Sequence, residues 1–271
     1  MTVTVVTGFS PAGLEEYGRN FLKGFDEFWR IGVDLVVYVE KPTYFDNGLP
    51  MKMPLPASGY VDKSRNIIFR LLSDARGCAE FIERHKDDPF ANGRKVESNW
   101  KEREREEGYN FRFDAVKFCR MAMFTADAAR KLNDDRILVW LDGDVMTKRP
   151  VPENFVEDLI GDHEIAFLGR EPKHPDAAFV AFRGVGLMAA TDWGEIYEKD
   201  QVFSMPEIHS AYVLKWCIDN ATNSDGLIKA SALNLTPKGR GHVWFQSPLC
   251  QYMDHLKGQK RKRRGQSKEW K

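Results

Sequence analysis

The sequence predicts an α/β fold, with a mixed, mostly parallel central sheet flanked by helices in a single domain. Three observations support this prediction. The first forty residues follow a strand–helix–strand pattern, a buried strand is expected at 137–141, and helical and strand-like stretches alternate after it. The length of 271 residues suits one large domain of this class. We place that domain at 1–258 and a basic tail at 259–271.

The first strand is expected at residues 2–7, which are mainly apolar and β-branched. Ser10 and Pro11 then supply an N-cap and a proline suited to the first helical turn. The helix that follows has apolar side chains near a 3.6-residue spacing, namely Leu14, Tyr17, Phe21, Phe25 and Phe28. A second strand is expected at 33–39. This β-α-β start implies a parallel sheet with a crevice above residues 7–9.

The middle of the chain is expected to be helical at 64–86 and again at 113–132. Between these helices, the stretch 84–110 is highly charged. We interpret it as an exposed insertion or lid, although a solvated surface also explains its charges. The elements expected afterwards are a helix at 153–160, strands near 165–168 and 177–182, helices at 193–203 and 206–220, and a last helix at 247–256.

Composition narrows the possible functions. Forty basic and forty acidic residues give a formal net charge of +0, so the molecule as a whole is not a polyanion binder. The four cysteines contain no Cys-x-x-Cys pair, which argues against a zinc cluster or a disulfide framework. No signal peptide and no apolar stretch long enough to span a bilayer is visible, so we expect a cytoplasmic protein.

The most informative motif is Asp142-Gly143-Asp144, which follows the apolar run at 137–141. Ligands of open α/β sheets collect at the carboxyl ends of such strands. Carboxylates two residues apart point the same way from extended backbone, and Gly143 would let a ligand approach the main chain. Paired carboxylates suit Mg²⁺ or Mn²⁺ bound together with substrate phosphates. The alternative is a solvated turn after a core strand.

A second motif near the end of the chain complements the first. His255 is followed by Gly258 and by a group of cations, with eight basic residues between Lys257 and Lys271. An imidazole can complete a metal coordination shell, and Lys or Arg can neutralise a diphosphate. A lone histidine is also common as a structural residue, so both interpretations of His255 stay open.

Together these features resemble a glycosyltransferase of the GT-A fold. The residues that carry the resemblance are the β-α-β start, Asp114 and Lys117 on a helix, the Asp142-Gly143-Asp144 triplet, and the terminal His255, Gly258 and Arg261. Their order is similar to the glycogenin and lipopolysaccharide galactosyltransferase group. The sequence segments 7–10 and 247–258 are similar to those of phage and bacterial members.

The resemblance implies a metal-dependent transfer from a nucleoside diphosphate sugar, with a UDP-sugar as the donor. Asp144 and His255 would hold Mn²⁺ or Mg²⁺, and Asp142 would share the metal or contact the ribose. The diphosphate would lie at Lys257, Gly258 and Lys260. The base would lie near Thr7, Gly8 and Phe9, with Asp114 and Lys117 on the nucleotide side.

Two details leave alternatives open. The proline-tryptophan that often ends the glycogenin-type motif is replaced here by Lys262-Arg263, which leaves the phosphate contacts undefined. Asp114, Lys117 and Arg120 fall along one helix face, where a surface row of ion pairs is the alternative to nucleotide binding.

The acceptor side is expected between the triplet and the carboxyl half. Its candidate residues are Glu171, His174, Asp176, Glu207, His209 and Asp219. Asp176 and Glu207 are the candidate catalytic carboxylates beside Asp142 and Asp144, because an inverting enzyme needs a base and a retaining one does not. The stretch from Glu207 to His209 is alternatively a helix-capping turn.

The acceptor itself is open between two classes. The basic tail could track a phosphate backbone, and the similarity to phage members suggests a 5-hydroxymethylated pyrimidine in DNA, reached by base flipping. A saccharide or a lipid-linked acceptor is the alternative. Two rival classes are a sugar-phosphate nucleotidyltransferase, whose glycine-rich N-terminal signature is missing, and a non-catalytic module that binds nucleotide-sugar or nucleic acid.

Overall fold

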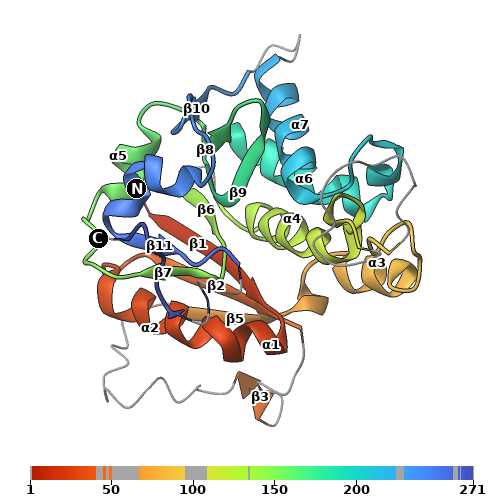
Figure 1. The fold of residues 1–271 in the computed structure, drawn as a ribbon, viewed down its shortest axis with the longest axis horizontal. Helices are drawn as coiled ribbons and strands as arrows, with labels where there is room; N and C mark the ends of the chain where they lie inside the picture. Colours follow the sequence, from red (N-terminus) through yellow and green to blue (C-terminus); the bar gives the residue numbers. More distant parts are fainter. Residues whose placement is uncertain are drawn as a thin grey trace.

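The computed structural model describes residues 2–40, 45–46, 49–50, 67–94, 109–133, 135–223, 229–258, 262 and 264–270. A seven-stranded sheet runs through the molecule in the order β10-β8-β9-β6-β1-β2-β5 (Figure 1). Its strands are β1 (Val3–Phe9), β2 (Asp34–Val39), β5 (Ile67–Leu71), β6 (Ile137–Leu141), β8 (Ile165–Arg170), β9 (Lys173–Phe182) and β10 (Ala232–Asn234). Only β9 runs antiparallel to its neighbours, β6 and β8. The sheet is therefore mixed and mostly parallel, as the sequence predicts.

The β-α-β start is confirmed. β1 and β2 pair in parallel, and the Ser10 hydroxyl accepts a hydrogen bond from the amide of Gly13 at 3.1 Å. The helical segment that begins at Pro11 comprises α1 (Pro11–Gly13), a π-helical turn (Leu14–Gly18) and α2 (Arg19–Phe28). The strand at 137–141 is also confirmed, and it pairs with β1.

The core lies on both faces of the sheet because side chains alternate along each strand. In β6, Ile137 and Val139 face one apolar cluster, whereas Leu138 and Trp140 face the other. The first cluster is covered by α2 and α5 (Phe155–Ile160), the second by four further helices. These are α3 (Cys78–His85), α4 (Ala115–Ala129), α6 (Gly186–Glu198) and α7 (Ser210–Asn223), which group on the right of Figure 1.

The helix expected at 64–86 is wrong in part. Residues 67–71 of the expected helix 64–86 form β5, which pairs in parallel with β2, and the helix α3 begins only at Cys78. The run Ile67-Ile68-Phe69 fits helix and strand spacing equally, and the open edge of β2 decides in favour of the strand. Most of the charged insertion at 84–110 lies outside the described residues.

The last expected helix, 247–256, is also wrong. A 3₁₀ turn (Pro248–Gln251) is followed by β11 (Met253–His255), which pairs antiparallel with β7 (Val145–Thr147). The serine-proline start is that of a helix, but the backbone groups of β7 form a ladder with residues 253–255 instead. This small sheet brings the end of the chain to the residues just after β6.

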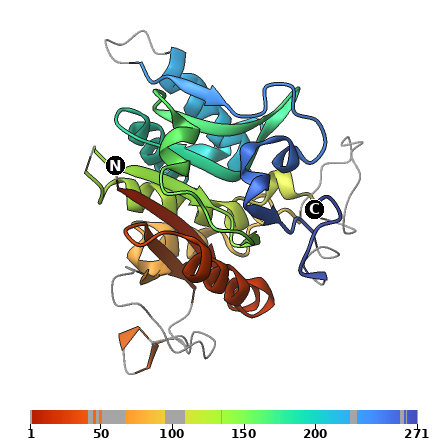
Figure 2. The ribbon, with the colours of Figure 1, turned by 90° about the vertical axis from the view of Figure 1, so that its left-hand side faces the viewer.

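A further two-stranded pair, β3 (Phe45–Asp46) and β4 (Leu49–Pro50), lies outside the central sheet. Figure 2 shows the red α2 and β1 region in the lower half of the view and the teal and light-blue segments in the upper half. Among the described residues, no helix combines the length and the apolar character needed to cross a bilayer.

Replacing Gly194 with Ala should destabilise the fold. A Cβ at this position of α6 would lie 2.3 Å from the Cβ of Ala126 in α4, so the two helices would have to move apart. Overpacking of this kind costs about 1–3 kcal/mol. Denaturant unfolding should reveal that loss, whereas Met188→Ala in the same helix, where Met188 is 65% exposed, should change stability by less than about 0.5 kcal/mol. Equal effects of the two substitutions would contradict the packing argument.

Candidate functional site

A pocket of about 230 Å³ opens where β1 and β6 end. β1 contributes Gly8 and Phe9, α4 contributes Lys117, and the turn after β6 contributes residues 142–144. The pocket therefore coincides with the crevice predicted above residues 7–9. Thr7 is fully buried and does not line the pocket.

The backbone and the side chains around Asp142 fix the position of the triplet. The indole N–H of Trp140 donates to Asp142 Oδ1 at 3.0 Å, and the amide of Asp142 donates to the carbonyl of Ala178 at 3.0 Å. At Gly143 a Cβ would lie only 2.4 Å from the ring of Phe9. Close packing against Phe9 therefore requires a glycine here, and Gly143 itself lines the pocket.

The β7–β11 pairing brings His255 to the triplet. His255 pairs with Val145, and the amide of Leu256 donates to the carbonyl of Asp144 at 3.0 Å. His255 Nε2 then lies 3.3 Å from Asp144 Oδ1. Donor atoms of Asp142, Asp144 and His255 all lie within 4.8 Å of one another. Two carboxylates and one imidazole at this spacing fit a divalent ion, and the mixed oxygen and nitrogen donors suit Mn²⁺ better than Mg²⁺.

The two carboxylates respond differently to their surroundings. Burial, followed by the neighbouring charge of Asp144, raises the pKa of Asp142 to about 7. Burial also opposes ionisation of Asp144, but His255 and Lys262 outweigh it and hold the pKa of Asp144 well below its usual range. The charge of Asp144 in turn raises the pKa of His255 against the effect of burial. The positive charge of His255 and Lys262 is therefore too small for both carboxylates to ionise fully at neutral pH.

Lys262, considered from the sequence only as part of the replaced proline-tryptophan ending, is a residue of the site. Its Nζ lies 3.2 Å from Asp144 Oδ2 and 4.2 Å from the centre of the Tyr17 ring. The segment around it is anchored because the amide of Ser267 donates to Asp254 at 2.8 Å. In the sequence, the only indication of a role for Lys262 was that it is a basic residue four positions after Gly258.

The other predicted phosphate contacts are placed differently. Lys257 Nζ lies 2.7 Å from Asp176 Oδ2, and Lys257 does not line the pocket. Gly258 has a φ of +88°, a backbone conformation that favours glycine. Lys260 and Arg261 lie outside the described residues.

The predicted helix face on α4 is divided between two roles. Asp114 is the N-cap of α4, since it accepts from the amide of Lys117 at 2.8 Å and from the hydroxyl of Tyr109 at 2.7 Å. Lys117 and Arg120 line the pocket, and Arg120 pairs with Glu40 at 2.6 Å. The surface row of ion pairs considered from the sequence is therefore not formed by these three residues.

Asp176 is the acceptor-side candidate whose charge acts on the triplet. Its charge contributes to the raised pKa of Asp142. Burial opposes its own ionisation, yet Lys257 and then His255 lower the pKa of Asp176 to about 2. Asp219, by contrast, forms an exposed pair with Lys215 on α7.

Glu207 belongs to a separate cluster. His209 Nε2 lies 2.8 Å and His174 Nε2 lies 3.2 Å from Glu207 Oε2, and Arg112 reaches Oε1 at 3.5 Å. The donor atoms of the two histidines and Glu207 also lie within 4.8 Å of one another, which makes this a second set that could hold a metal. Its charge, unlike that of the triplet, is already balanced by Arg112.

No protein-family model and no curated protein sequence matches the chain. Among solved structures, mouse xyloside xylosyltransferase 1 is 10% identical, with a TM-score of 0.40 over 81% of this chain and 76% of that protein. The glycosyltransferase GlyE of Streptococcus pneumoniae TIGR4 is 12% identical in its apo form, with a TM-score of 0.45 over 86% of this chain and 45% of GlyE. The chain thus spans less than half of GlyE. Likenesses at this level establish no function, which has to follow from the residues of the pocket.

Replacing Asp142 with Asn should stabilise the protein in the presence of a chelator at pH 8. A pKa of about 7, above the ordinary value of 3.8, means that ionisation of Asp142 costs folding free energy as the pH rises from about 4 through 7. Asn removes this cost and can still accept from Trp140. The melting temperature should rise at pH 8 and rise less at pH 5. Asp176→Asn is the control with the opposite sign, because the pKa of Asp176 is lowered, and it should destabilise at pH 8. Loss of stability in Asp142→Asn at pH 8 would refute the charge repulsion.

Proposed function

We propose that the chain is a GT-A-type glycosyltransferase that moves a sugar from a nucleoside diphosphate sugar, most simply a UDP-sugar, to an acceptor hydroxyl with the help of Mn²⁺ or Mg²⁺. The observation that carries the proposal is the meeting of Asp142, Asp144 and His255, of which the two aspartates line a pocket between β1, α4 and β6. His255 is more than a hundred positions from the two aspartates in sequence, and a purely structural turn would not need the imidazole.

The pocket has the kinds of surface that a nucleotide requires. Phe118 and Phe124 supply ring surface, and Lys117 supplies positive charge. Asp142 and Asp144 line the same pocket, beside Phe9. A nucleoside against the β1 and α4 walls would direct its diphosphate toward the carboxylates, as ligands of α/β folds commonly lie across the carboxyl ends of the strands.

The work of the chain in this reaction is to hold and to neutralise charge. Asp142, Asp144 and His255 would hold the ion, with Trp140 fixing the orientation of Asp142. The ion supplies Lewis-acid stabilisation of the diphosphate leaving group when bound. Lys262, which lies beside Asp144, can turn its ammonium from that carboxylate to the departing phosphate, where negative charge develops.

Asp176 is the better placed of the two candidate carboxylates on the acceptor side. Because its pKa of about 2 makes it a weak base, it suits an acceptor-orienting hydrogen bond better than proton removal. Both carboxylate oxygens of Glu207 are engaged by His174, His209 and Arg112, so any role of Glu207 would involve these three partners. A reaction with retention needs no base, so in such a reaction Asp176 would serve only to orient the acceptor.

Asp144→Asn should lower metal-dependent turnover of UDP-glucose or UDP-galactose by orders of magnitude, because the substitution removes a ligand and the partner of two cations. Turnover and thermal shift with UDP and Mn²⁺ measure the effect. Asp219→Asn, at an exposed pair on α7, is the matched control and should behave as the wild type. A near-normal rate in Asp144→Asn would reject the assignment. Binding of UDP and Mn²⁺ by the wild type without any turnover would indicate a non-catalytic module.

Lys262→Gln should separate phosphate neutralisation from metal binding. Removing one preorganised charge at a leaving group typically costs about 10²–10³ in turnover. Affinity for Mn²⁺ without nucleotide should not fall, because the lysine competes with the ion for Asp144. Steady-state kinetics and Mn²⁺ titration test this prediction, with Lys23→Gln on the exposed surface of α2 as the control. Unchanged turnover would remove Lys262 from the site.

A further inference from the structure

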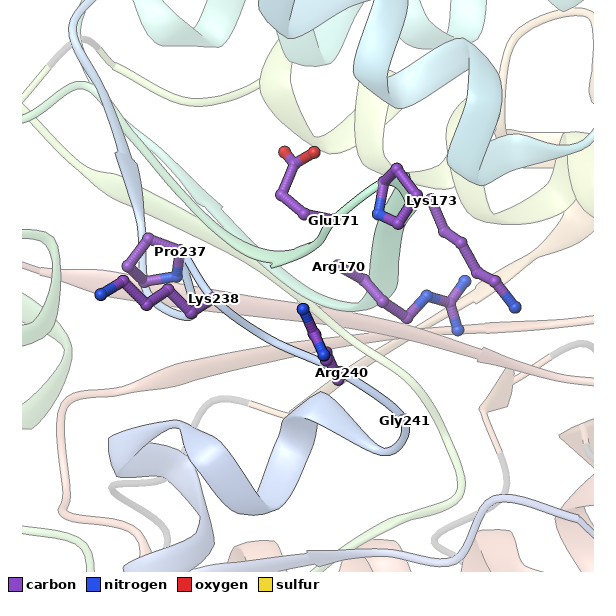
Figure 3. Close-up of a pocket in the computed structure, with 8 residues that line it drawn as sticks. Arg170, Glu171, Lys173, Pro237, Lys238, Arg240 and Gly241 are labelled. Carbon is purple, nitrogen blue, oxygen red and sulfur yellow. The ribbon is translucent and has the colours of Figure 1, made fainter.

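A second and larger cavity, of about 760 Å³, lies between the β8–β9 turn and the loop at 237–241 (Figure 3). Its walls contain four cationic side chains and a single carboxylate, that of Glu171. The cations are Arg170, Lys173, Lys238 and Arg240. In a protein with a formal net charge of +0, this is a local concentration of positive charge.

None of these four cations forms a salt bridge within the described part of the chain, whereas Arg130, Arg136 and Lys131 elsewhere all pair with carboxylates. Arg170 also has a buried Nε without a hydrogen-bond partner among the described residues. Donors left without a partner in a cavity are suited to an anionic ligand, and Arg favours phosphate in particular.

The cavity is built by a fixed framework. The hydroxyl of Thr236 donates to the carbonyl of Gly169 at 2.7 Å, and the amide of Gly169 donates to Asn234 Oδ1 at 2.9 Å. A Cβ at Gly239 would lie 2.7 Å from that same carbonyl, so the loop packs directly on the end of β8. Hydrogen bonds between segments far apart in sequence therefore hold the two walls together.

The cations are spread along the cavity. In Figure 3 Arg170 and Lys173 extend to one side, Lys238 extends to the other, and Arg240 lies between them in this view. Glu171 points away from all four. Apart from these charged residues, the walls consist of Pro172, Pro237 and Gly241, with no aromatic side chain on which a base could stack. Such a surface is suited to binding several successive phosphate groups, and it offers no aromatic ring for recognising a nucleobase.

The cavity adjoins the acceptor side of the proposed site. The charge of Arg170 contributes to the lowered pKa of Asp176, and Asp176 pairs with Lys257, two residues after His255. Lys173 directly precedes His174 of the second cluster. A chain held in the cavity would therefore continue toward Asp176 and the triplet.

We infer that this cavity binds successive phosphodiester groups of the acceptor, so that the sugar is transferred to a phosphodiester-linked polymer. The inference rests on the proposed function for its link to catalysis, and it deepens that function by naming the acceptor class. The phosphates would fix the register of the polymer, and a hydroxyl next to them would reach Asp176.

Salt dependence of binding gives the sharpest test. The probes are a short single-stranded oligodeoxynucleotide, poly(glycerol phosphate), which carries phosphodiesters without bases, and a neutral maltooligosaccharide. Lys238→Gln and Arg240→Gln should each weaken binding of a phosphodiester probe several-fold and reduce the slope of log K against log salt by about 0.7. Both residues are exposed, so the fold should persist. Lys23→Gln on α2 is the control and should leave the slope unchanged.

Each outcome decides between versions of the inference. Binding of both phosphodiester probes with the reduced slopes supports recognition of the phosphodiester itself, and binding of the oligonucleotide alone assigns nucleic acid. Binding of neither, slopes unaffected by the two substitutions, or equal affinity for the neutral sugar would overturn the inference. Thermal shift with UDP and Mn²⁺ on the same variants should stay at the wild-type value. If UDP and Mn²⁺ gave no thermal shift in the wild type, that result would count against the proposed donor site. The salt dependence of phosphodiester binding would still test the cavity separately.

Discussion

Two neighbouring, largely buried carboxylates at the wall of the pocket are the constraint on which this site depends. Burial and the charge of Asp144 keep Asp142 partly protonated near neutral pH, and Asp144 stays ionised because His255 and Lys262 lie against it. Such an arrangement is costly for a fold without a ligand. A divalent ion would relieve it, which is why we regard the pair as functional and its surroundings as means of holding it in place.

The fold meets this constraint through a small piece of sheet. β6 ends at the triplet, β7 continues from it, and β11 returns along β7 with His255 at the matching position. The anchoring of Ser267 on Asp254 then brings Lys262 to the same carboxylate. The smaller pocket includes Asp142 and Asp144 in its lining. The cationic cavity is linked to this centre through Arg170, whose charge acts on Asp176.

Much of the fold could be predicted, since β1, β2 and β6 are apolar runs with clear boundaries. β5 and β11 could not, because Ile67-Ile68-Phe69 and Met253-Asp254-His255 become strands only when β2 and β7 offer a free edge. The role of Lys262 could not be predicted either, because its position depends on how the C-terminal segment packs against the rest of the fold. The meeting of Asp144 and His255 was predicted by family resemblance, and the spacing of these residues in the sequence could not have given it. The cations of the larger cavity come from two loops that no sequence pattern connects.

Manganese anomalous diffraction from crystals grown with Mn²⁺ and UDP tests the central claim most directly. We predict one strong peak at bonding distance, about 2.0–2.3 Å, from carboxylate oxygens of the Asp142–Asp144 pair and from the imidazole of His255. A peak only at the cluster of His174, Glu207 and His209, or no peak beside the triplet while UDP is bound, would contradict it.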